Sequence, residues 1–154
     1  MGINFFDTAE VYSEGGSERL LGEFTSDLRE DIIIASKVSP SHSTYKGIIK
    51  VFNRSIDGLK TNYIDLYYVH WPNLLIPMKF TAKAFNELLD SGRIGAIGVS
   101  NFNLKRLIKS DKLTHSRVSA DQVRYSLLSR NIEKDLLPYC LRNKITLVAY
   151  SPLD

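Results

Sequence analysis

Residues 31–38 read DIIIASKV, an apolar, β-branched run with Lys37 near its end. Residues 64–71 read IDLYYVHW and repeat this arrangement, because His70 stands where the apolar stretch stops. Continuous apolar runs of this length are typical of strands that are buried on both faces of a parallel sheet. We therefore expect a parallel sheet with polar side chains at the downstream ends of its strands.

The rest of the chain alternates between strand-like and helix-like stretches. The expected strands cover residues 3–7, 31–38, 64–71, 96–100, 119–125 and 145–153. The expected helices cover residues 17–24 with Ser17 as N-cap, 48–59, 84–89 with a stop near Gly92, 104–110 and 133–144. Pro138 should bend or split the first turns of the last helix. This pattern predicts six strands and five helices.

Strand–helix alternation predicts an α/β protein, and two ways of closing its parallel sheet compete. A doubly wound sheet binds nucleotide through a glycine-rich turn after its first strand, but Gly92, Gly95 and Gly98 have the wrong spacing and lead into a strand. A (β/α)8 barrel of the TIM type carries functional groups at the ends of several strands, as found here. Eight strands and about 250 residues are typical of that barrel. Residues 1–154 are therefore expected to form a single, incomplete barrel domain with two unpaired sheet edges.

The polar strand ends are expected to meet on one surface. Parallel strands all end on the same side of the sheet, and barrel enzymes carry their active sites there. The residues concerned are Asp7, Lys37, His70, Ser100, Asn101 and Tyr150.

Composition limits the possible partners. Twenty basic and 17 acidic residues leave a net charge of +3, and no basic cluster indicates nucleic acid. No apolar run is long enough to cross a bilayer, so the cytoplasm is the expected location. His70 has no second histidine at metal-ligand spacing, so no metal is expected. Cys140 is expected to be an inert thiol on the buried side of a helix.

Short motifs along the chain resemble those of the aldo-keto reductases, in the same order. They are FDTAEVY (6–12), ASKV (35–38), YYVHWP (67–72), IGVSNF (97–102), the Gln122 segment and AYSPL (149–153). The resemblance runs from Gly2 to Leu153 and implies a (β/α)8 barrel that reduces aldehydes and ketones with NADPH. Measured against that family, the chain corresponds to strand 2 through strand 7.

The resemblance implies four catalytic residues. Tyr12 matches the proton donor, Lys37 the neighbouring cation, Asp7 the carboxylate that holds the lysine, and His70 the imidazole that orients the carbonyl. An ordinary tyrosine hydroxyl titrates near 10, and a nearby cation favours its ionised form. Tyr12 and His70 would also contact the substrate, and Trp71 would form a wall of its pocket.

The cofactor site follows from the same resemblance. Ser100, Asn101 and Gln122 match the residues that hold the nicotinamide carboxamide, for which amide and hydroxyl groups supply donors and acceptors. Tyr150 matches the residue that stacks on the nicotinamide ring, and Asp7 also belongs to this side of the site. Ser151 and Leu153 match positions along the pyrophosphate.

Several outcomes stay open at this point. The chain could act as an NADPH-dependent carbonyl reductase, as an inactive binding or regulatory module of the same family, or as a truncated fragment. The resemblance stops before the family's basic residues for the adenosine phosphate, so we expect NADPH to bind more weakly than in a full-length relative. We also expect self-association that covers the open sheet edges. Tyrosine and tryptophan near the rim favour a flat or apolar carbonyl substrate.

Overall fold

The computed structural model describes residues 2–154 and forms one sheet of six parallel strands in chain order. The strands are β1 (Phe5–Asp7), β2 (Ile33–Val38), β3 (Ile64–Val69), β4 (Ile94–Ser100), β5 (Val118–Arg124) and β6 (Thr146–Tyr150). The helices are α1 (Gly16–Thr25), α2 (Tyr45–Leu59), α3 (Met78–Asp90), α4 (Leu104–Leu113) and α5 (Leu136–Arg142). The predicted incomplete (β/α)8 barrel, with six strands and five helices, is confirmed.

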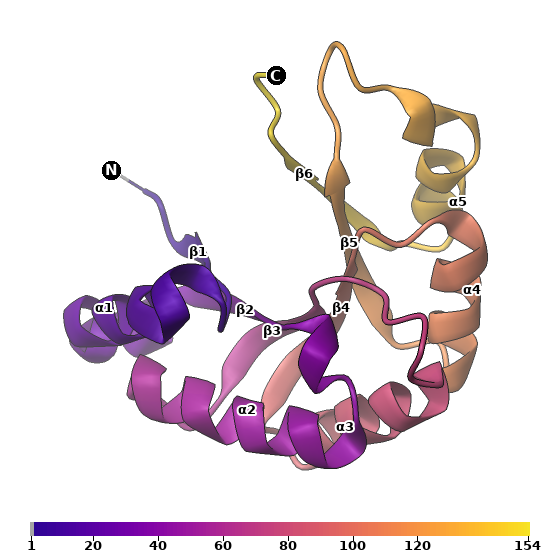
Figure 1. The fold of residues 1–154 in the computed structure, drawn as a ribbon. Helices are drawn as coiled ribbons and strands as arrows, with labels where there is room; N and C mark the ends of the chain where they lie inside the picture. The colour runs from indigo at the N-terminus through magenta and orange to yellow at the C-terminus, as the bar shows by residue number, and fades with distance from the viewer. Residues whose placement is uncertain (1) are drawn as a thin grey trace.

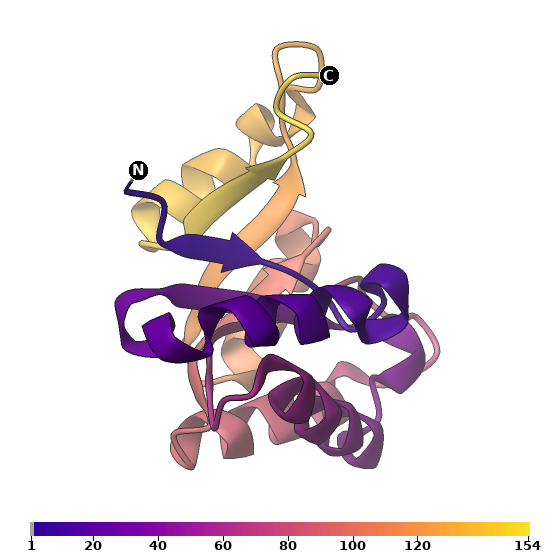
Figure 2. The same ribbon diagram turned by 90° about the vertical axis from the view of Figure 1, so that its left-hand side faces the viewer.

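The sheet is strongly curved, and the helices lie along its outer side. Figure 1 shows α1 to α5 following the convex face in an arc, while β1 and β6 stand at the two ends of the curve. The quarter-turned view in Figure 2 shows the strands running side by side toward the same edge. Within residues 2–154, β1 pairs only with β2 and β6 only with β5. Both ends of the half-barrel therefore offer a strand edge.

Two apolar clusters cover the two faces of the sheet. The larger cluster packs the helices against the sheet through side chains such as Ile34, Phe52, Tyr67 and Phe85. The smaller cluster joins Ala35, Tyr68 and Ala120 with Leu66 and Val148 across neighbouring strands. Because both faces are apolar, the strands read as nearly continuous hydrophobic runs in the sequence.

Gly98 makes room for a large side chain in the smaller cluster. A Cβ atom at Gly98 would lie 2.3 Å from Cδ1 of Tyr68, whose ring is fully buried. The two residues are paired across β3 and β4, so the glycine lets the tyrosine ring lie flat over the neighbouring strand.

The helix boundaries partly differ from the predicted ones. Ser17 is not an N-cap: α1 begins at Gly16 after Gly15 in a left-handed conformation, and the Ser17 hydroxyl accepts a hydrogen bond from Thr8 Oγ1 at 2.7 Å. This tertiary contact uses the side chain that was expected to cap the helix. The helix expected to begin at residue 84 begins at Met78, and the one expected to end at residue 110 continues to Leu113.

The effect of Pro138 is confirmed. The last expected helix is divided into a 3-10 turn over Asn131–Lys134 and the helix α5, which begins at Leu136 with Asp135 as its cap. Pro138 therefore lies in the first turn of α5, where its missing N–H costs no helical hydrogen bond. Cys140 is buried on this helix, and burial raises the pKa of its thiol to about 11. No helix within residues 2–154 has the length and apolar character required to span a bilayer.

Candidate active site

The polar strand ends line an open hollow of about 510 Å³ at the downstream edge of the sheet. Its lining contains most of the residues singled out in the sequence, and they come from all the strands except β2. The lining residues are Phe5, Asp7, Tyr12, His70, Trp71, Ser100, Asn101, Gln122, Val148, Ala149 and Tyr150. Lys37 from β2 lies beneath this lining, fully buried, and contacts Asp7.

Lys37 is a buried cation with two oxygen partners. Its ammonium Nζ forms an ion pair with the Asp7 carboxylate and donates to the Thr8 carbonyl at 2.8 Å. Desolvating an ammonium group is costly unless it is paired and hydrogen-bonded, and these contacts supply both. The same Nζ lies 5.0 Å from the centroid of the Tyr12 ring, which is a cation–π distance. A positive charge therefore lies next to an exposed phenol.

Tyr12 and His70 pack edge to face above that cation. Their ring centroids are 5.8 Å apart with an interplanar angle of 81°. The His70 backbone N–H donates to the Val38 carbonyl at 3.0 Å, which continues the pairing of β3 with β2. Burial, and then the charge of Lys37, lower the pKa of the His70 imidazole. His70 is therefore neutral at neutral pH and keeps one N–H donor and one acceptor nitrogen.

Side-chain hydrogen bonds connect this centre with the far end of the sheet. Gln122 Nε2 donates to the second Asp7 oxygen at 2.9 Å, and Ser100 Oγ donates to the backbone carbonyl of Gln122 at 2.9 Å. Asn101 Nδ2 donates to Ser100 Oγ at 3.0 Å, and Tyr150 donates its hydroxyl to Asn101 Oδ1 at 2.7 Å. These contacts form one continuous chain from Lys37 to Tyr150 across five strand ends.

A left-handed backbone conformation brings the Asn101 side chain to this position. Its φ of 62° lies in the left-handed region, which asparagine tolerates better than most residues. Its side chain also donates to the His70 carbonyl at 3.2 Å, so Asn101 ties the end of β4 to the end of β3.

Ser151 and Leu153 are not brought to the hollow. Both are exposed, Leu153 to 98%, and neither lines the hollow. Trp71 does line it and is 48% exposed, so about half of its surface is open. Phe5, Val148 and Ala149 also line the hollow but were not singled out in the sequence. Period-two alternation indicates two of them, because Phe5 and Val148 stand two positions before Asp7 and Tyr150.

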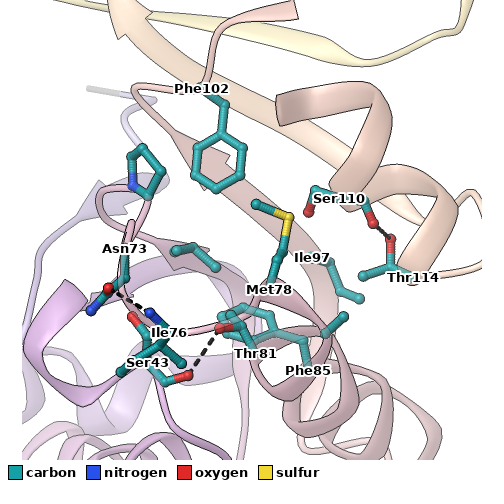
Figure 3. A pocket seen from close by; sticks show the side chains of 13 residues that line it. Ser43, Asn73, Ile76, Met78, Thr81, Phe85, Ile97, Phe102, Ser110 and Thr114 are labelled. Atoms are coloured by element: carbon teal, nitrogen blue, oxygen red, sulfur yellow. Dashed lines mark hydrogen bonds between the residues drawn. The ribbon is translucent and has the colours of Figure 1, made fainter. Parts of the chain in front are cut away.

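A second, much smaller cavity lies between β3, β4, α3 and α4 and has a different character (Figure 3). Apolar side chains such as Met78, Phe85 and Phe102 form most of its wall. Its two threonine hydroxyls are engaged, since Thr81 donates to the Ser43 carbonyl at 2.9 Å and Thr114 to the Ser110 carbonyl at 3.0 Å. Its volume of about 20 Å³ suits a single water molecule. This cavity is therefore a poorer candidate for proton chemistry than the hollow at the strand ends.

Comparison with known proteins agrees with this arrangement. The model of the aldo/keto reductase family matches residues 1–154. The chain belongs to the aldo-keto reductase family. An uncharacterised oxidoreductase of Mycobacterium tuberculosis is 43% identical over 155 residues, which cover 99% of this chain and 47% of the relative. The chain thus spans about half the length of the curated relatives it matches.

Solved aldo-keto reductase structures have the same fold over almost the whole chain. A thermostable aldo-keto reductase in complex with the inhibitor epalrestat superposes with a TM-score of 0.93 at 42% identity, covering 96% of this chain and 54% of that protein. An aldo-keto reductase of Klebsiella pneumoniae in complex with NADPH superposes with a TM-score of 0.90 at 35% identity, covering 98% and 53%. The half-barrel is thus a contiguous part of the fold of these aldo-keto reductases.

Proposed function

We propose that this chain carries the proton-transfer centre and the nicotinamide side of the cofactor site of an NADPH-dependent carbonyl reductase. The observation that carries this proposal is the buried Lys37 ammonium, paired with Asp7 and lying 5.0 Å from the Tyr12 ring, with His70 packed against the same ring. Family membership and the NADPH-bound Klebsiella pneumoniae relative support the choice of reaction and cofactor.

In the proposed reaction, NADPH held by Ser100, Asn101, Gln122 and Tyr150 would supply the hydride for the new C–H bond as the carbonyl π bond breaks. Tyr12 donates its hydroxyl proton to the carbonyl oxygen, which becomes the alcohol, and then recovers a proton from solvent. Lys37 stabilises the phenolate that is left, and Asp7 keeps Lys37 charged and oriented. Neutral His70 donates a hydrogen bond to the same oxygen and fixes its direction. A positioned proton donor of this kind contributes about 10²–10⁴ in rate.

The amide groups at the strand ends suit a nicotinamide carboxamide. The Gln122 side chain uses only its Nε2, in the contact with Asp7, so its side-chain oxygen Oε1 can accept from a ligand amide, and Ser100 and Asn101 complete the set. The hydroxyl bond from Tyr150 to Asn101 holds the tyrosine ring in place for stacking. We assign Ser151 and Leu153 to the pyrophosphate side as part of the same proposal.

The substrate proposed is a small aldehyde or ketone with a flat or apolar body. Phe5, Tyr12 and Trp71 contribute aromatic surface to the hollow beside the proton-transfer centre. Aromatic side chains favour planar and apolar groups through stacking and burial of surface.

Loss of NADPH absorbance with an aromatic aldehyde tests the proposal. Tyr12→Phe removes only the proton donor and should lower turnover by about 10²–10⁴-fold. Tyr63→Phe is the matched control, because it also deletes one hydroxyl and its ring lies under Arg29, away from the hollow. Equal turnover of wild type and Tyr12→Phe would contradict the assignment of Tyr12.

We further propose that the strand edges of β1 and β6 are covered by self-association of the chain. Parallel strands at a sheet edge present unpaired N–H and C=O groups that favour pairing with another chain. Phe5 and Ile33, which pair with each other at the start of β1 and β2, are each 41% exposed, which adds apolar surface next to the β1 edge.

A further inference from the structure

The segment that carries Tyr12 has an unfavourable backbone. It forms a 3-10 turn over Tyr12–Gly15, and Ser13 and Glu14 have φ angles of 50° and 52° in the left-handed region. Side chains with a Cβ atom rarely adopt this conformation, and such strain persists only where the surrounding structure holds it. The position of Tyr12 therefore depends on contacts outside the turn.

Glu10, two residues before Tyr12, makes such contacts. Its side chain is 1% exposed, and Oε1 accepts from the Ser39 backbone N–H at 2.6 Å and contacts His42 Nδ1 at 3.0 Å. Oε2 accepts from Arg54 Nη2 at 2.7 Å. The two carboxylate oxygens thus have three partners in all, from the loop after β2 and from α2.

The Glu10 backbone adds a link to the catalytic strand. Its N–H donates to the Lys37 carbonyl at 3.2 Å, so Glu10 fastens the Tyr12 segment next to the ammonium that Tyr12 faces. Tyr12 lies in the turn directly after Glu10, and this turn is closed by the hydrogen bond from the Tyr12 N–H to the Ala9 carbonyl at 3.0 Å. Carboxylate bonds to N–H and guanidinium donors are short and strong, and suit this fastening role.

Glu10 acts from outside the hollow. Its side chain lines a groove on the helix side, together with Glu23, Arg54 and others, and does not line the hollow that contains Tyr12 and His70. It therefore cannot touch a substrate bound there. Glu10 can act on the reaction through the backbone that it holds and, to a smaller extent, through its charge, which raises the pKa of the His70 imidazole against the effect of burial.

We infer that Glu10 is a positioning residue that holds Tyr12 at its distance from Lys37 by clamping the strained turn to the loop after β2 and to α2. This inference rests on the proposed function for its kinetic consequence, but its structural part can be measured separately. Misplacing a reacting group by about 1 Å can cost about 10²-fold in rate, so loosening the clamp should lower kcat more than it changes KM.

The test compares Glu10→Gln with Glu23→Gln, which makes the same charge change in the same groove at an exposed residue. Glutamine keeps the size of the side chain but presents an N–H2 group to one of the three donors. Amide hydrogen exchange should accelerate about tenfold or more over residues 8–16 in Glu10→Gln, with no change in β3. The kcat for aldehyde reduction should fall between about tenfold and 100-fold, with KM within about twofold. Glu23→Gln should match wild type in both measurements.

Wild-type exchange over residues 8–16 together with wild-type kcat in Glu10→Gln would overturn the inference. If Glu10→Gln does not fold, Arg54→Met is the deciding variant, because it removes the hydrogen bond from the exposed Arg54 guanidinium to Glu10 and leaves Glu10 in place. Unchanged exchange over residues 8–16 in Arg54→Met would then overturn the inference. If the wild-type chain shows no turnover, the proposed function fails for this chain while the exchange measurement still decides the role of Glu10. Tyr12→Phe separates the two roles, since it should lower turnover by about 10²–10⁴-fold and leave the exchange unchanged.

Discussion

Asp121 on β5 is a fully buried carboxyl group for which neither side-chain oxygen has a hydrogen-bond partner within residues 2–154. Burial raises the pKa of this carboxyl to about 8, and the nearby Phe102 N–H offsets the shift in part without reaching hydrogen-bond geometry. Asp121 is therefore largely protonated at neutral pH. A neutral acid at this position avoids the cost of an isolated buried charge.

The raised pKa of Asp121 predicts that stability falls with rising pH. The unfolded chain releases this proton near pH 3.8 and the folded chain near 8, so the folded state is penalised increasingly between these values. Asp121→Asn removes the carboxylate charge that the folded wild type acquires at high pH. The difference in unfolding free energy between this variant and wild type should therefore shift in favour of the variant by about 2–3 kcal/mol between pH 6 and pH 9. Urea unfolding at both pH values measures this. The exposed Asp27→Asn serves as control, and an equal gain in that variant would contradict the assignment.

The Asp7–Lys37 pair predicts a rescue of stability without a rescue of function. Asp7→Asn leaves the fully buried ammonium without its charged partner, which should cost about 3 kcal/mol of unfolding free energy. Adding Lys37→Met replaces that ammonium by an apolar group of similar length, so the double variant should regain most of the loss. Denaturant unfolding of the two single variants and the double variant tests this, and additive losses would refute it. Turnover should stay low in all three variants under the proposed function.

At the scale of elements, some site residues are the last residues of strands, and others lie in the turns that follow the strands. Asp7, Ser100 and Tyr150 each close a strand, whereas Tyr12 and Asn101 reach the hollow through left-handed or 3-10 backbone just beyond one. Such backbone is specified by contacts between elements rather than by local propensity.

The packing of β3 against β4 predicts a cost for one added methyl group. Gly98→Ala places a Cβ atom 2.3 Å from the buried Tyr68 ring, and overpacking of this kind costs about 1–3 kcal/mol. Gly58→Ala in α2 is the matched control, because its Cβ would meet its nearest atoms at 3.6 Å and alanine favours a helix by up to about 1 kcal/mol. Thermal or urea unfolding should therefore give opposite signs for the two variants. A neutral Gly98→Ala would show that Tyr68 can move aside.

At the scale of the whole molecule, six strands curve through part of a barrel and end in two edges. Figure 1 shows β1 and β6 facing across the open side of the curve, with each terminus of the described chain near one of them. The inner face of the sheet between them carries the smaller apolar cluster of Ala35, Tyr68 and Ala120. This geometry supports the proposal that another chain covers the open side.

Light scattering tests the proposed self-association directly. The measured molar mass should exceed the 17.5 kDa of one copy, and it should fall when the protein is diluted. Replacing Phe5 with lysine places a charge beside the β1 edge and should shift the population toward the monomer, as charged residues do on natural edge strands. Leu75→Lys is the control, because it charges an exposed residue in the loop after β3 instead. A concentration-independent monomer with a cooperative thermal transition would contradict the proposal.

Local pattern in the sequence was sufficient for the order of elements and for the identity of most residues in the hollow. The hydrophobic pattern and the composition identify the six strands, because a strand covered on both faces must be apolar along its length. Polar groups can then follow only at the end of the strand, at the edge of the sheet. The polar ends of these strands identify Asp7, Lys37, His70, Asn101 and Tyr150 for the same reason. The split at Pro138 is equally local, since it follows from the missing N–H of one residue.

Tertiary structure decided what depends on groups far apart in the chain. The start of α1, the left-handed turn after Tyr12 and the buried clamp of Glu10 follow from bonds between β1, the loop after β2 and α2, which no local window contains. Ser17 has the local pattern of an N-cap and Glu10 has no local pattern that distinguishes it, and each is held by a partner that only folding supplies. The distance between Tyr12 and Lys37 belongs to this second group, because it is set by packing between separate elements while their residue types are set by the sequence.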